Sequence, residues 1–195
     1  MKRTVIGAGA LMLMAGTASA TTYTFNSGPA ASPTLSGDIF TVSASSDGIL
    51  NYEEPLVVQT PTGLGIQGGP DTQPGLIDGN PTFSSEALTV TFNYAVTLDS
   101  FTLFGIDWND DYNIYLDGVL YADSATDSNV VIDQTVTSFT LEAKSSLGED
   151  PFIIGSNGFK LASFTVSPVP VPAAAGLLAS AIGALALLRR RRAAA

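Results

Sequence analysis

The sequence contains no cysteine and no histidine among its 195 residues. Without cysteine, no disulfide reinforces the fold. Without either residue type, the chain cannot build Cys/His zinc sites, histidine-assisted nucleophiles or histidine proton shuttles. Carboxylates, hydroxyls and a few amines are what remain for chemistry, and we identify no catalytic residue among them.

Basic residues are also few: eight Lys and Arg stand against eighteen Asp and Glu, for a formal net charge of −10. All eighteen acids lie in residues 21–167, which contain only two basic residues, Lys144 and Lys160, so this segment carries −16. Such a charge repels phosphate backbones and anionic lipid surfaces, so nucleic acid is not an expected partner. Scattered acidic side chains also keep a secreted protein soluble, which accounts for most of them.

The first twenty residues have the composition of a secretory signal peptide. Lys2 and Arg3 precede an uncharged run, and the small residues Ala18 and Ala20 precede Thr21 at the expected cleavage site. Charge, apolar run and small-residue site in this order are typical of such a leader. We therefore expect the Sec export machinery and signal peptidase to act on residues 1–20, which leaves residues 21–167 as one acidic domain.

The domain is predicted to be all-β, because short apolar or β-branched runs alternate in it with clusters of Gly, Pro, Asn, Asp and Ser. Many short strands in about 150 residues favour an antiparallel β-sandwich, with a jelly-roll-like topology. Alternation is clearest in residues 88–93, whereas residues 100–106 are apolar on both faces and are expected in the middle of a sheet. The predicted strands are residues 22–26, 39–43, 56–59, 88–93, 100–106, 113–116, 119–122, 130–132, 138–143 and 159–166.

Residues 60–82 differ from the rest, since they hold six glycines and four prolines. We expect a long ordered loop with at most one short strand, at residues 64–67. Loops of this length in compact domains are often functional, although a mobile connection is the alternative.

A possible calcium site follows the predicted strand at residues 100–106. Asp107, Asn109 and Asp111 stand at positions 1, 3 and 5 of an oxygen-rich calcium loop. Tyr112 occupies position 6, where that loop needs glycine, and Gly118 occupies position 12, where it needs a bidentate glutamate. The segment is therefore not an EF-hand.

The alternative for this segment is a hairpin with no metal. A strand at residues 101–107 would turn at residues 109–111 into a strand at residues 112–116, because Asn and Asp favour turns. A second turn of type I′ is predicted at Asp117-Gly118. Calcium bound here would need further oxygen ligands, for which the candidates are Asp71, Asp78 and Glu86.

Aromatic residues flank the same turn, namely Trp108, Tyr112 and Tyr115. Exposed aromatic rings beside amide and acidic groups stack on sugar rings, so these three are candidate sugar contacts. The alternative for Trp108 is a place at the edge of the core. A glycan hydrolase would instead need two cooperating carboxylates. The adjacent acids Glu53 and Glu54 would point to opposite faces of a strand and do not supply such a pair.

Residues 168–195 form a separate C-terminal segment. Its apolar run, residues 173–188, would be about 24 Å long as a helix, which is marginal against a hydrocarbon core of about 30 Å. We expect a short transmembrane helix here, because the arginines that follow can extend to the membrane interface. Four consecutive arginines follow it and are expected to stay cytoplasmic, which places the acidic domain outside the membrane. These arginines are Arg189, Arg190, Arg191 and Arg192.

The start of this segment completes a three-part signature. The motif residues Val169, Pro170, Val171, Pro172 and Ala173, followed by the apolar run and the arginines, resemble the PEP-CTERM class of bacterial sorting signals. The likeness is to its VPLPA-CTERM variant, with valine in place of leucine. The resemblance implies a Gram-negative host and an exosortase, a membrane-embedded protease that cleaves near the motif. It also implies transient anchoring in the inner membrane before transfer to the cell surface or release.

Together these features predict an exported, non-catalytic component of the cell surface or extracellular matrix. Extracellular polysaccharide is a candidate partner of this component, and Ca2+ is a candidate cofactor. A carboxylate-based glycan hydrolase and a purely structural or adhesive subunit are the alternatives.

Overall fold

The structure, a computed structural model, describes residues 19–26, 30–32, 34–47, 54–68, 74–80, 84–107, 110–143 and 157–169, together with residues 181, 182 and 189. The chain divides into two units, Ser19–Val169 and a second made of Met1–Ala18 with Pro170–Ala195. Most of the second unit, including Ala18, the sorting motif from Pro170 to Ala173 and the arginines Arg190 to Arg192, lies outside the described residues. Among the residues that are described, no helix is long and apolar enough to cross a membrane.

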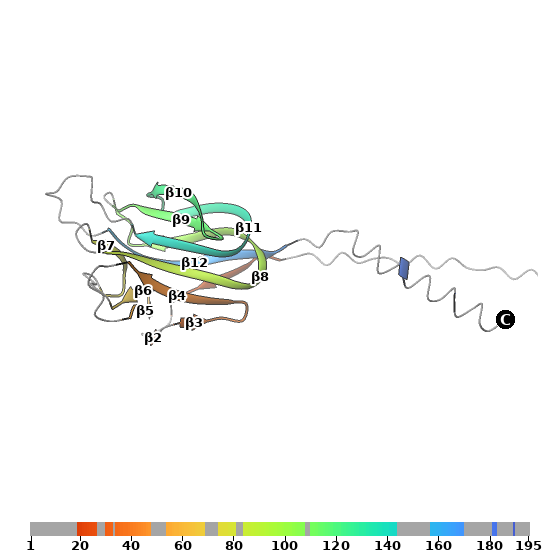
Figure 1. Cartoon of the computed structure of the whole chain (residues 1–195), viewed down its shortest axis with the longest axis horizontal. Coiled ribbons are helices and arrows are strands. Elements are labelled where there is room, and N and C mark those ends of the chain that lie inside the picture. Colours follow the sequence, from red (N-terminus) through yellow and green to blue (C-terminus); the bar gives the residue numbers. More distant parts are fainter. Residues whose placement is uncertain are drawn as a thin grey trace, which may run out of the picture. The chain divides into compact units, whose positions relative to one another are not determined.

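The unit Ser19–Val169 is all-β in its described part, as predicted, and every strand pairing there is antiparallel. Figure 1 shows the strands running alongside one another through the length of this unit. The strands are β1 (Thr21–Thr24), β2 (Ala30–Ser32), β3 (Thr34–Ser36), β4 (Phe40–Ser46), β5 (Leu56–Thr60), β6 (Gly63–Gln67), β7 (Ile77–Asn80), β8 (Ser84–Phe104), β9 (Tyr112–Leu116), β10 (Val119–Ala125), β11 (Asn129–Ala143) and β12 (Asn157–Pro168).

Strands β8 and β11 are long and connect two groups of strands. They pair with each other over most of their length, while the other edge of β8 pairs with β4 at residues 86–92 and with β12 at residues 96–104. The group formed by β3, β4, the first part of β8, the second part of β11, β9 and β10 is called the β9 side below. The group formed by the first part of β11, the second part of β8, β12, β1, β6, β5 and β2 is called the β12 side.

Alternation along the strands places the core between these two groups. In β8, Leu88, Val90 and Phe92 are buried, whereas the threonines between them point away from the core. Rings from the two sides meet there: Phe101 stacks on Phe139 with centroids 5.9 Å apart, and Phe40 meets Phe164 edge-on at 5.1 Å. Each buried phenylalanine stabilises the fold by about 1.5–3 kcal/mol.

Two local predictions need correction. Residues 60–82 contain the predicted strand as β6, but they also contain β7, and β6 forms a hairpin with β5. The hairpin predicted between residues 101–107 and 112–116 is wrong, because β9 pairs with β11 and β10. Both edges of the second part of β8 are already taken by β11 and β12, so β9 pairs with the free edge of the second part of β11.

The turn at Asp117-Gly118 is confirmed. The φ angles of Asp117 and Gly118 are 49° and 78°, both in the left-handed region that a type I′ turn requires. The turn joins β9 to β10 with no additional residue, so it fixes the position of β10 at the end of the β9 side.

Candidate functional site

The outer face of the β9 side carries a row of hydroxyl groups across adjacent strands. The pairing register aligns one side chain from each of β3, β4, β8, β11, β9 and β10. Their neighbours along each strand, such as Val42, Val90 and Ile114, are buried, so the row points away from the core. At roughly 4.8 Å per strand the six aligned side chains span about 24 Å. Five of them carry hydroxyl groups and are called the hydroxyl row, namely Thr34, Ser43, Thr89, Thr140 and Tyr115; the sixth is Leu120 of β10.

Hydrogen bonds fix the centre and one end of the hydroxyl row. The Oγ1 atoms of Thr89 and Thr140 lie 2.9 Å apart and share a hydrogen bond. Beside them, Glu142 Oε2 accepts hydrogen bonds from the Tyr115 hydroxyl at 2.7 Å and from Asn113 Nδ2 at 3.2 Å. The hydrogen bond to Glu142 is the largest cause that raises the pKa of Tyr115, so the phenol stays neutral and its ring orientation is fixed.

Apolar side chains from β10 extend this end of the row. Leu120 lies directly opposite Tyr115 in the register and is half exposed, and Tyr121 next to it is also exposed. The surface therefore combines an apolar platform, an ordered carboxylate and amide, and a line of hydroxyls. This is the combination that binds sugars, because their rings have apolar faces and their hydroxyls both donate and accept hydrogen bonds.

The predicted sugar contacts are only partly compatible with the structure. Tyr115 lies on the outer face, since its neighbour Ile114 is buried. Tyr112, by contrast, is fully buried against Phe159 and donates its hydroxyl to the backbone oxygen of Asp127 at 2.6 Å. Tyr112 is therefore withdrawn as a sugar contact. Trp108 lies outside the described residues.

The proposed calcium loop is organised by a residue that the sequence did not single out. Asp110 is only 3% exposed; its Oδ2 accepts a hydrogen bond from the Asp107 amide at 2.7 Å, and its Oδ1 accepts one from the Gly158 amide at 3.0 Å. Burial raises the pKa of Asp110, and the two amide hydrogen bonds oppose that rise. Asp110 thus ties the loop after β8 to the start of β12.

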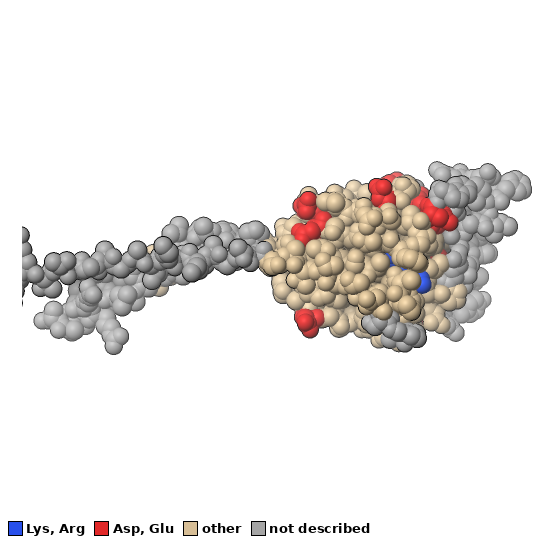
Figure 2. Space-filling view, turned by 180° about the vertical axis from the view of Figure 1, so that it is seen from behind, with Lys and Arg blue, Asp and Glu red and all other residues tan. Residues whose placement is uncertain are grey.

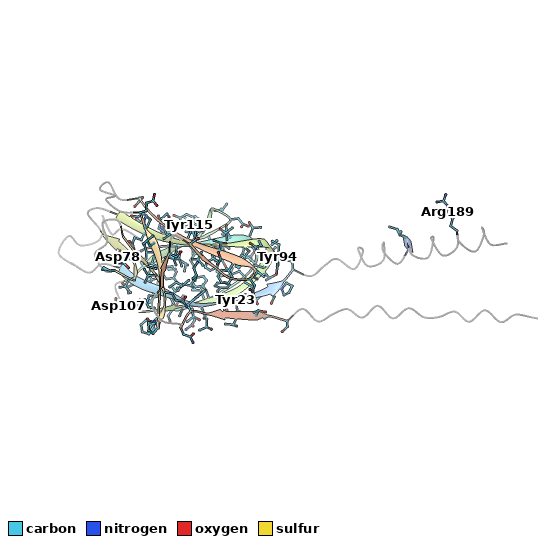
Figure 3. All side chains as sticks on the ribbon, turned by 90° about the horizontal axis from the view of Figure 1, so that it is seen from below. Tyr23, Asp78, Tyr94, Asp107, Tyr115 and Arg189 are labelled. Carbon is cyan, nitrogen blue, oxygen red and sulfur yellow. The ribbon has the colours of Figure 1, made fainter. Side chains whose placement is uncertain are left out.

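Two further acids, Asp78 and Glu86, lie buried close to β12. Asp78 stands opposite Gly158 in the register of β7 with β12, and its backbone amide donates to Glu86 Oε2 at 3.0 Å. Both side chains are almost completely buried, at 2% and 1% exposure. Figure 3 shows Asp78 and Asp107 at the same end of the domain.

The calcium site remains a prediction. Within the described residues, no group of three or more acids is close enough to share a metal ion. Asn109 and Asp71 belong to the segments outside that description, while Asp107 and Asp111 lie at the surface or near it.

Sequence reasoning found Tyr115 but missed Glu142, Asn113 and Thr140. The signal for these residues is the strand register, which aligns β9 with the second part of β11 and which the printed sequence does not contain. Comparison of the chain with protein-family models, with curated proteins and with solved structures gives no match.

Proposed function

We propose that this chain is an exported, non-catalytic component of the cell surface or extracellular matrix that binds polysaccharide through the outer face of its β9 side. The observation that carries the proposal is the hydroxyl row ending at Tyr115, with Glu142 and Asn113 held in place beside it. Flat, ordered hydroxyl and aromatic surfaces suit extended neutral glycans, because they bind without a closed pocket.

The proposed architecture is a β-sandwich of the jelly-roll type, with the β9 side and the β12 side as its two layers. It is supported by the ring contacts between the two sides and by the passage of β8 and β11 from one side to the other. In such a sandwich the hydroxyl row belongs to an outer face of one layer.

Binding is preferred over glycan hydrolysis because two of the buried acids are engaged by the backbone. Asp110 accepts hydrogen bonds from two amides, and Glu86 accepts one from Asp78. Such carboxylates stabilise loops, whereas a hydrolase needs an acid and a base on either side of a sugar bond.

The export part of the proposal rests on the two ends of the sequence. Strand β1 begins at Thr21 and β12 ends at Pro168, so removal of residues 1–20 and cleavage near Val169 would leave every described strand intact. On this proposal the chain is anchored transiently in the inner membrane of a Gram-negative bacterium and is then transferred by an exosortase-type protease.

Glycan binding is tested with the purified full-length protein in mild detergent and an array of neutral hexasaccharides. Tyr115→Ala and Thr140→Val are expected to weaken binding several-fold, since each removes a group from the row. Tyr94→Ala is the matched control, because Tyr94 is an exposed tyrosine outside the row. Equal binding by all three variants, or no binding of any glycan at millimolar concentration, contradicts the proposal.

Export and sorting are tested by the intact mass of the protein from its own cells. We expect a chain that starts at Thr21 and ends near Val169, and a longer chain in cells lacking the sorting protease. A mature protein that still ends at Ala195 would instead indicate a permanent anchor. Calcium is tested separately by titration calorimetry, where the absence of heat and of thermal stabilisation in the millimolar range would exclude it.

A further inference from the structure

Lys160 is the one Lys or Arg among the described residues of the domain Ser19–Val169. It lies on the β12 side, and its Nζ donates hydrogen bonds to Thr60 Oγ1 at 3.2 Å and to Thr62 Oγ1 at 3.3 Å. Neither partner is a carboxylate, although the domain carries eighteen acids. Figure 2 shows the blue atoms of the domain next to tan, uncharged residues, with the acidic side chains in red at other positions on this face.

A tight turn presents the two threonines to Lys160. Thr60 pairs with Gly63 across the β5–β6 hairpin, which leaves Pro61 and Thr62 as its two-residue loop. The proline restricts the backbone of this loop, and Thr60 Oγ1 donates to the backbone oxygen of Gly63 at 2.9 Å. The hydroxyls are thus held in position before any ligand arrives.

Gly63 is required for this close approach. A Cβ atom at Gly63 would lie 2.8 Å from the backbone oxygen of Leu161 and 3.0 Å from Cβ of Lys160, and its φ of +148° is rarely adopted by other residues. The glycine therefore lets the turn pack directly against β12 beside Lys160.

These hydrogen bonds do not use every N–H group of the Lys160 ammonium. A lysine ammonium has three N–H groups, and two of them are directed to Thr60 and Thr62. Because Thr60 donates its own proton to Gly63, the hydrogen bond of 3.3 Å between the two hydroxyls is donated by Thr62. The third ammonium N–H of Lys160 is therefore the donor that remains for a ligand, and a carboxylate accepts a charge-assisted hydrogen bond from such a group.

An aromatic ring, that of Phe104, lies on the side of Lys160 away from the β5–β6 turn. Phe104 stands directly opposite Lys160 in the register of β8 with β12, so their Cβ atoms are roughly 5 Å apart on the same outer face. Its side chain is 52% exposed, while the residue before it, Leu103, is buried in the core. An exposed ring in this place offers an apolar face next to a cation.

We propose that Lys160, Thr60, Thr62 and Phe104 form a subsite for a uronic acid residue of an anionic polysaccharide. The sugar carboxylate accepts from the Lys160 ammonium, which the two threonine hydroxyls hold in place, and the apolar face of the sugar ring stacks on Phe104. The inference rests on the proposed polysaccharide-binding function and names a ligand class for a second surface, on the β12 side.

Charge complementarity favours this ligand in spite of the acidic domain. At physiological ionic strength the screening length is about 8 Å, so the local charge around a bound group outweighs distant acids. Within the described residues, the groups that accept hydrogen bonds from Lys160 are uncharged hydroxyls. An anionic sugar would add a carboxylate to them.

The test uses the full-length protein in mild detergent and two hexasaccharide probes. One is an oligogalacturonate, and the other is the same oligosaccharide with its carboxyl groups reduced to alcohols. Affinity for each is measured by calorimetry on the wild type, on Lys160→Met and on Phe104→Ser. Lys144→Met is the control for net charge, and Val131→Ser controls for loss of an exposed apolar side chain, since Val131 is 70% exposed.

We expect Lys160→Met to bind the oligogalacturonate about tenfold or more weakly than the wild type, as loss of a charge-assisted hydrogen bond implies. The same variant should bind the reduced probe as the wild type does, whereas Phe104→Ser should weaken both probes. Equal losses in Lys160→Met and Lys144→Met would show a net-charge effect and overturn the subsite. Binding of neutral glycans through the hydroxyl row without any binding of oligogalacturonate would also overturn it, while leaving the proposed function intact.

Discussion

The buried carboxylate of Asp110 gives the sharpest prediction about this fold. It lies between the loop after β8 and the start of β12, and it accepts one hydrogen bond from each. Asp110→Ala removes both acceptors, and Asp110→Asn keeps one while replacing the other with an amide that cannot accept. We expect both variants to loosen the attachment of this loop and to lower the free energy of unfolding.

The magnitude follows from the groups that lose their partner. A buried amide left without an acceptor costs about 1–3 kcal/mol. The Gly158 amide lies on β12, and both amide hydrogen bonds to Asp110 are partly buried. We therefore expect Asp110→Ala to cost about 2–4 kcal/mol and Asp110→Asn about 1–2 kcal/mol.

The effect of pH has a defined sign. The pKa of Asp110 in the folded protein is raised above 3.8, chiefly by burial, so the native state holds this proton more tightly than the unfolded chain. Its contribution to stability is largest below pH 3.8, falls as the pH rises from 3.8 to the raised pKa, and is constant above it. The stability advantage of the wild type over Asp110→Asn should follow the same course.

Urea unfolding followed by circular dichroism at several pH values measures these quantities. Asp133→Asn is the control, because Asp133 is exposed and Asn tolerates its φ of 51°. If Asp110→Ala unfolds within about 0.5 kcal/mol of Asp133→Asn, then Asp110 does not hold the loop. A stability advantage that grows with rising pH across the same window would refute the assigned role of burial.

Three further predictions concern single positions. Asp117 Oδ1 accepts three hydrogen bonds of 2.8 Å, so Asp117→Ala should cost about 1–2 kcal/mol after allowance for exposure, and Asp117→Asn less. Burial alone would raise the pKa of Asp117, but these hydrogen bonds outweigh burial and lower the pKa. The stability that Asp117 contributes should therefore be lost in acid unfolding, as the pH falls through the lowered pKa. Gly65→Ala should destabilise the fold by about 2–3 kcal/mol, because the new Cβ would meet the backbone oxygen of Gly75. Gly118→Ala is the comparison in thermal unfolding and should cost about 1 kcal/mol, since Gly118 has open space around it but a positive φ. Glu142→Gln should lower the pKa of Tyr115 toward 10. In an ultraviolet titration, the phenolate transition of Tyr115 should then occur at a lower pH, and this transition should be absent from Tyr115→Phe.

The sequence contained the local features of the fold. The alternation in residues 88–93 and the Asp117-Gly118 turn were predicted correctly, because each depends on neighbouring residues only. The lengths of β8 and β11 were not predicted. Their middle parts, around Asn93 and Asp133, contain irregularities at which the pairing of β8 with β11 shifts register, and the φ of Asp133 is 51°. Each strand continues across its irregularity because the segments on both sides of it are paired.

The candidate site also combines features that neighbouring residues predict with features that depend on distant residues. Tyr112 and Tyr115 are three positions apart in one strand, so alternation already places them on opposite faces, and the sequence could have excluded one of them. Which one is buried depends on the pairing of β9 with β11. The role of Asp110 was not accessible at all, because its partner Gly158 lies 48 positions away along the chain.

The distribution of charge connects the two proposed surfaces. On the β12 side, Lys160 is the one basic side chain of the described part of the domain, and its ammonium donates to two uncharged threonine hydroxyls. On the β9 side, by contrast, the ordered charge is Glu142, which accepts hydrogen bonds from neutral donors. The two surfaces therefore suit different sugars, neutral at the hydroxyl row and acidic at Lys160, and a polysaccharide that contains both kinds of sugar would satisfy each surface with chemistry that the other lacks.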